Sequence, residues 1–367
     1  NIVSISESPM MGGLLYVGTD DGLIQVTEDD GKNWRKVETF PGVPKWTYVS
    51  DVYASPKDED TVFATFNNWQ TGDYKPYVLK STDRGKTWTN IMGDLPAKHD
   101  VWALAQDEVD GDLLFAGTEF GLFFTVDGGG HWTQLKGGMP REQVRDLTIQ
   151  RREHDVVMAT FGRGFWILDD YTALRDVNDK TLGEMAHLFP LRDTYEFTPW
   201  GLGQDGADGI GPIGGNYTTP NPPVGAVLTY NVAANFPKDA RLALSFADAA
   251  GRPVCRLDVS KDAGLRREVW DLRAPGVNGG RGGGGRGGGR AGAAATPEPA
   301  PIGGVPSCTP PPNPGGRGGG GGGFAQVPTG RYTATLEQIF GETVTPMGAP
   351  QSFEVKPLPE QNYKLYR

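Results

Sequence analysis

The stretch Ser81-Thr82-Asp83-Arg84-Gly85-Lys86-Thr87-Trp88 decides the fold, because its pattern Ser/Thr-x-Asp-x-Gly-x-x-Trp occurs three times in the chain. We call each copy an acidic turn. The copies are Thr27, Asp29, Gly31, Trp34; Ser81, Asp83, Gly85, Trp88; and Thr125, Asp127, Gly129, Trp132. The aspartates lie 54 residues apart (29 to 83) and then 44 apart (83 to 127). Recurrence at this period predicts a repeat architecture whose unit has the size of a propeller blade.

The residue types of the acidic turn each have a physical reason. A short aspartate in a tight turn accepts hydrogen bonds from nearby backbone N–H groups. The glycine permits a positive φ that other residues resist, and the hydroxyl adds a second local bond. The tryptophan is expected to bury a large apolar area beside the following strand. The motif therefore predicts a structural turn that holds two strands together.

These motifs resemble the Asp-box, or BNR-like, repeats of sialidase-like and sortilin-type propellers and of xyloglucan-active glycoside hydrolases. The resemblance covers about residues 1–195. It implies an all-β fold built from Asp-box β-propeller blades. It does not decide the function, because these families include enzymes and receptors.

Each repeat unit is expected to contain four short strands rich in β-branched and aromatic residues. The predicted strands are Val3–Ser8, Leu14–Thr19, Leu23–Thr27 and Trp34–Val37; then Tyr48–Ala54, Thr61–Phe66, Tyr77–Ser81 and Trp88–Ile91; then Val101–Gln106, Leu113–Thr118, Leu122–Thr125 and Trp132–Leu135. A fourth unit without an acidic turn is predicted from Val144–Gln150, Val156–Phe161 and Phe165–Leu168, with His187–Leu191 as its outermost strand.

Four blades are few for an Asp-box propeller, and the chain opens directly on a predicted strand at Asn1-Ile2-Val3. We therefore expect the remaining blades upstream, in the same chain or in a chain separated from it by cleavage. The segment Gly162-Arg163-Gly164-Phe165-Trp166-Ile167-Leu168-Asp169-Asp170 resembles the end of the propeller in large exported proteins. This resemblance implies a periplasmic or extracellular location.

The second half of the chain predicts a different all-β domain. Residues 1–197 are assigned to the blades, 198–223 to a Gly/Pro-rich linker, and 224–367 to an immunoglobulin- or fibronectin III-like β-sandwich. Its expected strands are Ala226–Val232, Arg241–Phe246, Val254–Asp258, Arg266–Asp271, Arg331–Gln338 and Gln351–Lys356. Pro328-Thr329-Gly330-Arg331-Tyr332 resembles the strand entry of bacterial sandwich domains.

A low-complexity insert, residues 275–327, interrupts this sandwich with Gly-, Arg- and Pro-rich sequence. Such composition cannot bury enough apolar surface to order itself. Cys255 and Cys308 are the only two cysteines and are candidates for a disulfide in an oxidising compartment. Arg-Gly-Gly tracts can bind RNA, so an RNA-binding insert remains a third functional possibility beside a plain flexible loop.

Composition narrows the function further. The 367 residues carry a net charge of −10, which disfavours binding of nucleic acid through a basic face. No run approaches the roughly 20 apolar residues of a membrane helix. The four histidines are isolated from one another, so no metal site is predicted, and no cofactor motif is present.

The topology of a blade predicts which end carries a ligand. The acidic turns connect third and fourth strands, so the second-to-third-strand turns and the connections between blades lie at the opposite end. Trp46, Trp69, Tyr74 and Arg163 fall in those loops and are the candidate ligand-binding residues. Equally, the aromatic side chains could pack beneath their own loops, and Arg163 could bridge neighbouring blades.

Glycosidic cleavage needs two carboxylates across the bond. Asp51, on a predicted innermost strand, and Glu119 are the catalytic candidates, but no spacing pairs them with a second acid. The leading prediction is a non-catalytic exported module that recognises a protein or a glycan through the end opposite the acidic turns. The alternative is a glycoside hydrolase of the xyloglucanase or sialidase kind.

Overall fold

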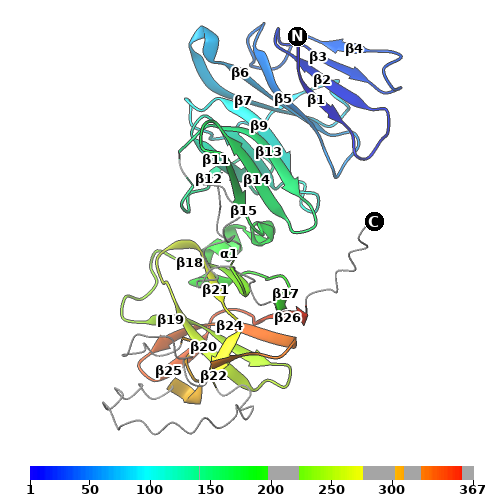
Figure 1. The fold of residues 1–367 in the computed structure, drawn as a ribbon. Coiled ribbons are helices and arrows are strands. Elements are labelled where there is room, and N and C mark those ends of the chain that lie inside the picture. The colour runs from blue at the N-terminus through cyan, green and yellow to red at the C-terminus, as the bar shows by residue number, and fades with distance from the viewer. Residues whose placement is uncertain (140, 197–222, 276–301, 310–323, 358–367) are drawn as a thin grey trace, which may run out of the picture. The chain divides into compact units, whose positions relative to one another are not determined.

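The computed structural model describes residues 1–139, 141–196, 223–275, 302–309 and 324–357 (Figure 1). The chain divides into two compact units, Asn1–Val177 and Asn178–Arg367. The sequence analysis instead expected the first domain to extend to residue 197. The predicted linker, apart from its last residue, falls outside the described residues, as does most of the predicted insert.

The first unit consists of four antiparallel sheets, numbered here in chain order, whose strands follow one another without crossing. The strands of sheets 1 to 4 are β1 (Ile2–Glu7), β2 (Leu15–Thr19), β3 (Ile24–Thr27) and β4 (Arg35–Val37); β5 (Tyr48–Ala54), β6 (Val62–Asn68), β7 (Asp73–Ser81) and β8 (Thr89–Asn90); β9 (Val101–Gln106), β10 (Leu114–Thr118), β11 (Gly121–Thr125) and β12 (Thr133–Gln134); and β13 (Val144–Gln150), β14 (Asp155–Thr160) and β15 (Phe165–Leu168).

The acidic turns join the third and fourth strands of sheets 1, 2 and 3. In the second copy, the Ser81 hydroxyl donates to Asp83 Oδ1 at 2.7 Å, and the amides of Gly85 and Thr87 donate to Ser81 Oγ and Asp83 Oδ1 at 2.8 Å each. Burial raises the pKa of Asp83, but the bonds from Thr87 outweigh it and lower that pKa to about 2. Gly85 has φ +75°, which a glycine adopts without steric cost.

Charged side chains connect neighbouring acidic turns. Arg84 pairs with Glu28 of the preceding turn at 3.1 Å and with Asp60 of its own sheet at 2.7 Å. Arg35 of sheet 1 donates to the carbonyl oxygens of Arg84 and Gly85. These bonds hold sheets 1 and 2 together at the end of the sheets where the acidic turns lie.

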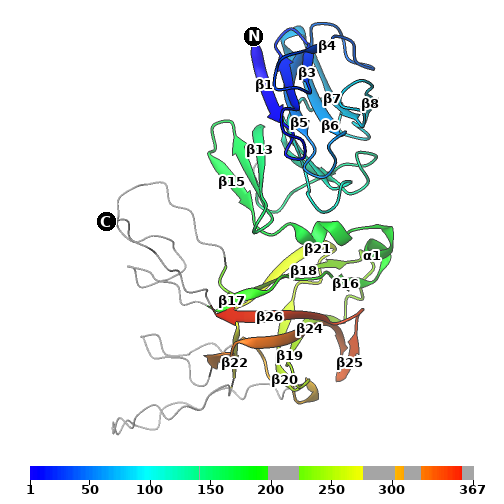
Figure 2. The same cartoon turned by 90° about the vertical axis from the view of Figure 1, so that its right-hand side faces the viewer.

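Successive sheets pack face to face through apolar side chains, with their first strands next to each other (Figure 2). One core joins sheets 1 and 2 and includes Tyr16, Ile24, Val52 and Phe66. A second joins sheets 2 and 3 and includes Phe63, Val78, Leu104 and Trp132. The strands β6, β9, β10 and β11 are buried along almost their whole length, as strands covered on both faces of a sheet are expected to be.

The chain leaves sheet 4 differently from the prediction. The segment η2 (Thr172–Asp176) follows β15 and returns to sheet 3, where Tyr171 and Arg175 bond to Asp107. The helix α1 (Asp179–Gly183) and the strand β16 (Ala186–Leu188) come next. Assigning His187–Leu191 to the fourth sheet was wrong, because β16 pairs with β18 of the second unit. A short apolar strand carries no local information about its pairing partner.

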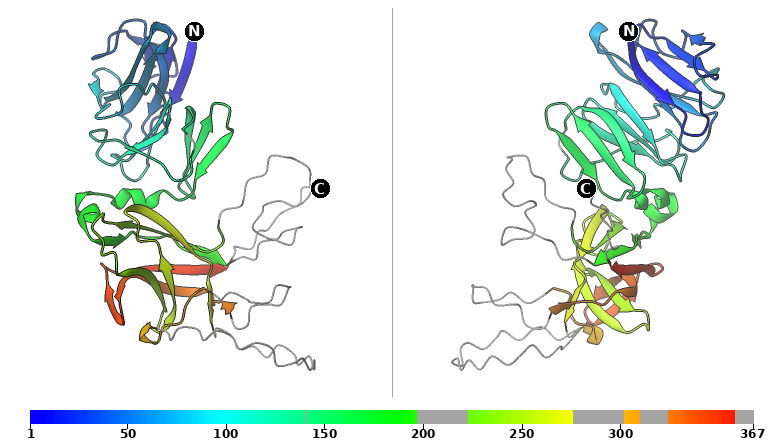
Figure 3. Two further views of the ribbon diagram at one scale, coloured as in Figure 1. Left: turned by 90° about the vertical axis from the view of Figure 1, so that its left-hand side faces the viewer. Right: turned by 45° about the vertical axis from the view of Figure 1, so that its right-hand side comes forward.

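The second unit has two main sheets. One contains β16, β18 (Ala226–Val232) and β21 (Gly264–Trp270). The other contains β17 (Thr194–Glu196), β26 (Gln351–Pro357), β24 (Gly330–Phe340), β25 (Thr343–Pro346), β19 (Arg241–Asp248) and β20 (Pro253–Val259), and β22 (Arg273–Pro275) pairs separately with β23 (Phe324–Gln326). Strands distant in sequence lie side by side here, seen as yellow-green beside orange and red in Figure 3.

A shared apolar core lies between these two sheets and is centred on Trp270. Its indole stacks on Phe246 with ring centroids 4.0 Å apart and donates through Nε1 to the Arg273 carbonyl at 3.0 Å. Cys255 and Cys308 form a disulfide bond. It holds the segment that contains η3 (Ile302–Gly304) against β20, where the Cys308 amide donates to the Arg256 carbonyl at 2.8 Å.

Candidate functional site

The meander order of the sheets places two kinds of loop at one end of the first unit, away from the acidic turns. These loops are the second-to-third-strand turns and the connections that lead from each sheet to the next. We call this the aromatic end. Five of the seven exposed aromatic side chains of the first unit, as far as the structure describes it, lie there: Trp46, Trp69, Tyr74, Phe120 and Phe161. The other two are Trp34, in an acidic turn, and Phe165, at the start of β15.

Trp46 is 74% exposed and has φ +66°. This left-handed conformation costs a bulky residue roughly 1–2 kcal/mol. Gly22 packs directly beneath it, since a Cβ at Gly22 would lie 2.8 Å from the Thr47 carbonyl oxygen. The connection that carries Trp46 is therefore pressed against the turn of sheet 1, and the indole projects into solvent instead of packing under its loop.

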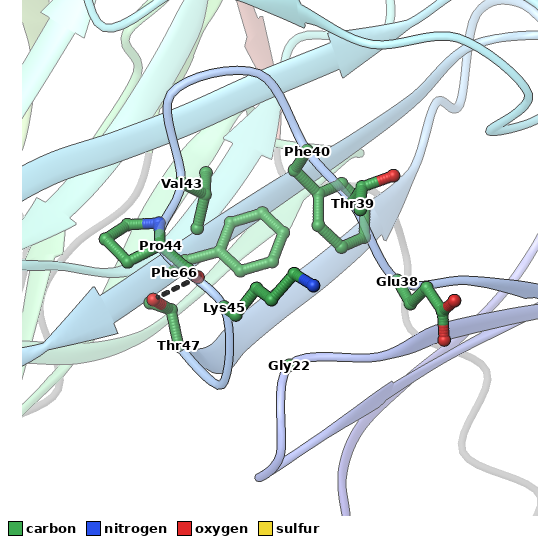
Figure 4. Close-up of a pocket in the computed structure, with 9 residues that line it drawn as sticks. All are labelled: Gly22, Glu38, Thr39, Phe40, Val43, Pro44, Lys45, Thr47 and Phe66. Atoms are coloured by element: carbon green, nitrogen blue, oxygen red, sulfur yellow. Dashed lines mark hydrogen bonds between the residues drawn. The ribbon is translucent and has the colours of Figure 1, made fainter.

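A small pocket of about 190 Å³ lies within the same connection between sheets 1 and 2, where Pro44, Lys45 and Thr47 help to line it (Figure 4). Phe40, Val43, Pro44 and Phe66 form its apolar wall, and Glu38 and Lys45 also line it. The Thr47 hydroxyl donates to the Pro44 carbonyl at 2.8 Å and closes the loop. The pocket is smaller than the roughly 300–1,000 Å³ of a drug-sized ligand site, so it suits one substituent of a larger ligand.

Replacing Trp46 with glycine is expected to raise the free energy of unfolding of the first unit by about 1 kcal/mol. Glycine removes the left-handed strain, although its greater freedom in the unfolded chain offsets part of the gain. Urea unfolding followed by tryptophan fluorescence measures the change. Lys45→Gly, at a neighbouring position without positive φ, is the control and should destabilise. A destabilised Trp46→Gly protein would show that the conformation carries no strain.

The long turn of sheet 2 carries Trp69 and Tyr74. The η1 segment (Trp69–Thr71) ends at Gly72, whose φ of +82° reverses the chain. Asp73 then accepts a hydrogen bond from the Tyr77 hydroxyl at 2.6 Å. This bond fixes the start of β7, which carries Tyr74. The side chains of Trp69 and Tyr74 are each about half exposed.

A polar network surrounds Glu119, one of the two catalytic candidates. Its carboxylate accepts from Trp102 Nε1 at 3.1 Å and from the Gln143 amide. The Arg145 guanidinium stacks over the Trp102 ring at 3.7 Å and lies 5.3 Å from the centre of the Phe161 ring. Sequence reasoning missed Trp102, Gln143 and Arg145, because strand sequence does not show that three strand ends meet beside one turn.

Asp100 is buried near Glu119, and its Oδ1 has no hydrogen-bond partner. Burial, and then the negative charges of Glu119 and Asp73, raise its pKa to about 6. Asp100 is thus a buried acid of raised pKa beside a second carboxyl group, that of Glu119. However, Asp100 is almost inaccessible to a substrate.

Both carboxylate oxygens of Asp51, the other catalytic candidate, accept hydrogen bonds. Ser4 of sheet 1 donates to Oδ1 at 3.1 Å, and the Leu104 amide of sheet 3 donates to Oδ2 at 3.0 Å. Burial raises its pKa to about 7. The carboxylate therefore links three first strands. Arg163 is exposed and pairs with Glu142 at 3.0 Å, which holds the adjacent loop.

The described residues were also searched for groups of metal ligands and for membrane-spanning helices. No group of three or more His, Cys, Asp or Glu residues in the parts of the chain that the structure describes could hold a metal ion. No helix in the same parts is long and apolar enough to cross a membrane.

Sequence comparison relates the chain distantly to xyloglucanases, while no protein-family model matches it. Xyloglucanase Xgh74A of Acetivibrio thermocellus is 27% identical over 160 residues, 37% of this chain and 19% of that enzyme. A xyloglucanase of Paenibacillus sp. is 26% identical over 136 residues, 33% of this chain and 13% of that enzyme. The matched region thus spans less than a fifth of either relative.

Solved structures resemble the chain only loosely. The GH74 xyloglucanase of Xanthomonas campestris has a TM-score of 0.39 and 16% identity, covering 95% of this chain and 45% of its own. The GH74 enzyme of Niastella koreensis has a TM-score of 0.38 and 14% identity over 47% and 29%. YCF48 of Cyanidioschyzon merolae has a TM-score of 0.34 and 16% identity over 46% and 52%.

Proposed function

We propose that the first unit is a non-catalytic Asp-box propeller module that binds a polysaccharide chain across its aromatic end, and that the second unit is an immunoglobulin-like sandwich. The observation that carries the binding proposal is the gathering of Trp46, Trp69, Tyr74, Phe120 and Phe161 at one end. Such exposure of apolar rings is costly unless a partner covers them. Flat rings spaced along loops suit the faces of successive sugar residues.

Xyloglucan is the first ligand to test, since the matched relatives are named xyloglucanases. Isothermal titration with xyloglucan oligosaccharides should detect binding. Trp46→Ala, Trp69→Ala and Tyr74→Ala should each weaken it roughly 3- to 10-fold, because one ring contact contributes about 0.5–1.5 kcal/mol. Phe340→Ala, which removes an exposed ring of the second unit, is the matched control and should leave binding unchanged. Binding that none of the three variants alters would exclude the aromatic end.

A second candidate, glycoside hydrolysis, is favoured by the Asp100–Glu119 pair beside Trp102. Retaining and inverting glycosidases both use two carboxyl groups that flank the scissile bond. If the chain were this enzyme, Glu119→Gln would abolish release of reducing ends from xyloglucan without weakening binding. The non-catalytic proposal instead expects no hydrolysis from either protein.

A further inference from the structure

Short polar side chains join the first strands of sheets 1, 2 and 3. Ser4 of β1 accepts a hydrogen bond from the Val52 amide of β5 at 2.9 Å. Asp51 of β5 accepts one from the Leu104 amide of β9 at 3.0 Å, and its other oxygen is bonded to Ser4 Oγ at 3.1 Å. A single carboxyl group therefore lies at the junction of three sheets, and its protonation state bears on both contacts.

The Asp51 carboxyl is bonded less completely than the carboxylates of the acidic turns. An ionised carboxylate offers about four acceptor sites. Asp83 receives bonds from four donors within its own turn, at 2.6 to 2.9 Å. Asp51 has two partners, and the 3.1 Å to Ser4 Oγ exceeds the roughly 2.5–2.7 Å of a hydroxyl that donates to an ionised carboxylate. These contacts suit a neutral carboxyl better than an ionised one.

The surroundings of Asp51 also lack a counter-charge. β5 packs against β1, β2, β6 and β9, and β13 packs against β9. The titratable side chains of these strands, apart from Asp51 itself, are Glu7 of β1, Tyr16 of β2, Tyr48 and Tyr53 of β5, and Arg145 and Asp146 of β13, while β6 and β9 have none. Arg145 is the one cation of this set, and its guanidinium stacks over the Trp102 ring. Among the described residues, the charge that acts most on Asp51 is the negative one of Asp146.

The pKa of Asp51 agrees with this geometry. Burial raises that pKa more than the bonds from Leu104 and Ser4 lower it, and the charge of Asp146 raises it further, to about 7. Asp146 occupies the corresponding position of β13, since the register of both strands shifts at that position. Asp146 is exposed, so the two carboxyl groups occupy one repeated position in different surroundings.

We propose that Asp51 is a pH-responsive link between sheets 1, 2 and 3, which holds their first strands together when it is protonated and loosens them when it ionises. In the neutral form Oδ1 donates its proton to Ser4 Oγ, which has a second acceptor site beside the one that the Val52 amide uses. Oδ2 still accepts from the Leu104 amide. In the ionised form a negative charge lies between the buried side chains of Val52 and Leu104 with two donors and no cation, which is unfavourable.

The raised pKa fixes the direction of the pH dependence. A carboxyl group whose pKa is higher in the folded than in the unfolded protein contributes stability that is complete below the unfolded value, about 4 for aspartate. This contribution is lost as the pH rises through the folded value, about 7 for Asp51. The first unit is therefore expected to hold its first three sheets more firmly in acidic than in alkaline solution.

The test is urea unfolding of the whole chain, followed by tryptophan fluorescence, for wild type and Asp51→Asn. Asparagine is neutral at every pH and can make both bonds, so this variant lacks only the titration. From about pH 5 to about pH 8, the unfolding equilibrium constant of the wild type should rise at least about 10-fold relative to that of the variant. Groups that titrate in both proteins, such as Asp100, cancel in this ratio. A ratio that does not change with pH would overturn the proposal.

Asp146→Asn is the matched control, because it removes the exposed carboxyl group at the corresponding position of sheet 4. It should retain most of the pH dependence of the wild type. A control variant that loses the pH dependence as completely as Asp51→Asn would assign the effect to Asp146 and overturn the role of Asp51.

Two further measurements separate this link from a general loss of stability. Carbon-13 NMR of the aspartate carboxyl groups should show one resonance that titrates near pH 7 and is absent from Asp51→Asn. Hydrogen exchange of the Leu104 amide, corrected for the intrinsic rate, should lose at least about 10-fold of its protection between about pH 5 and pH 8 in the wild type and none in the variant. A midpoint for Asp51 below about pH 5, or equal protection in both proteins, would contradict the proposal.

Discussion

Replacing Asp107 with asparagine is expected to lower the free energy of unfolding of the first unit by about 3 kcal/mol. Asp107 is fully buried at the end of β9 and accepts from the Tyr171 hydroxyl at 2.6 Å and from Arg175 Nε at 2.9 Å. Asparagine would leave the partly buried guanidinium of Arg175 without a counter-charge, and breaking a buried pair typically costs roughly 3–5 kcal/mol. The segment after sheet 4 would lose its attachment to sheet 3.

Urea unfolding monitored by tryptophan fluorescence measures this loss. Glu108→Gln, which changes the next residue in a surface pair 3.7 Å from Arg151, is the control and should shift stability by less than about 1 kcal/mol. A loss for Asp107→Asn no larger than that of the control would contradict the assigned role.

The stability difference between wild type and the Asp107→Asn variant is expected to depend on pH. Burial raises the pKa of Asp107, but bonds from Arg175 and Tyr171 outweigh it and hold that pKa below its ordinary value. A lowered folded-state pKa stabilises the protein above about pH 4, the ordinary value for aspartate, and this contribution is lost as the pH falls further. The difference between wild type and Asp107→Asn should therefore shrink between about pH 5 and pH 2. A constant difference would mean that the carboxylate charge contributes nothing.

Reducing the disulfide between Cys255 and Cys308 should lower the free energy of unfolding of the second unit by about 4 kcal/mol. The two residues are 53 positions apart in sequence, and a link of that span removes roughly this much conformational freedom from the unfolded chain in the chain-entropy model. Both sulfurs are buried, so reduction also releases the segment paired with β20.

Thermal and urea unfolding with and without dithiothreitol measure the effect. The Cys255→Ala/Cys308→Ala double variant should resemble the reduced protein and show no response to the reductant, which controls for effects elsewhere. Equal stability of the oxidised and reduced wild type would show that the link adds nothing to folding.

Most strands of the first unit could be predicted from sequence, since alternation and turn residues act over a few positions. The acidic turns are local in the same sense: Asp83 bonds only to residues within four positions of itself. Which strands pair with each other was harder to predict. The strand at Ala186–Leu188 was assigned to the wrong unit because its partner β18 lies about 40 residues downstream.

The same distinction between local and distant information applies to the residues of the candidate site. Trp46, Trp69 and Tyr74 were identified from the topology of a repeat, and the structure places all three in exposed loops at one end. The surroundings of Glu119 and the engaged oxygens of Asp51 could not be predicted, because their partners come from neighbouring sheets. Ser4 and Leu104, the partners of Asp51, lie 47 and 53 residues from it.

The sequence by itself determined the repeat, its turn chemistry and the end of the sheets to which its loops belong, because each depends on short-range hydrogen bonding and on strand order. Only the tertiary structure decided which repeated positions are covered. Ile5 of β1 and Val52 of β5 are both apolar residues of the first strand of a sheet, yet Ile5 is exposed and Val52 is buried. Burial depends on whether another sheet packs there, and that is a property of the assembled fold.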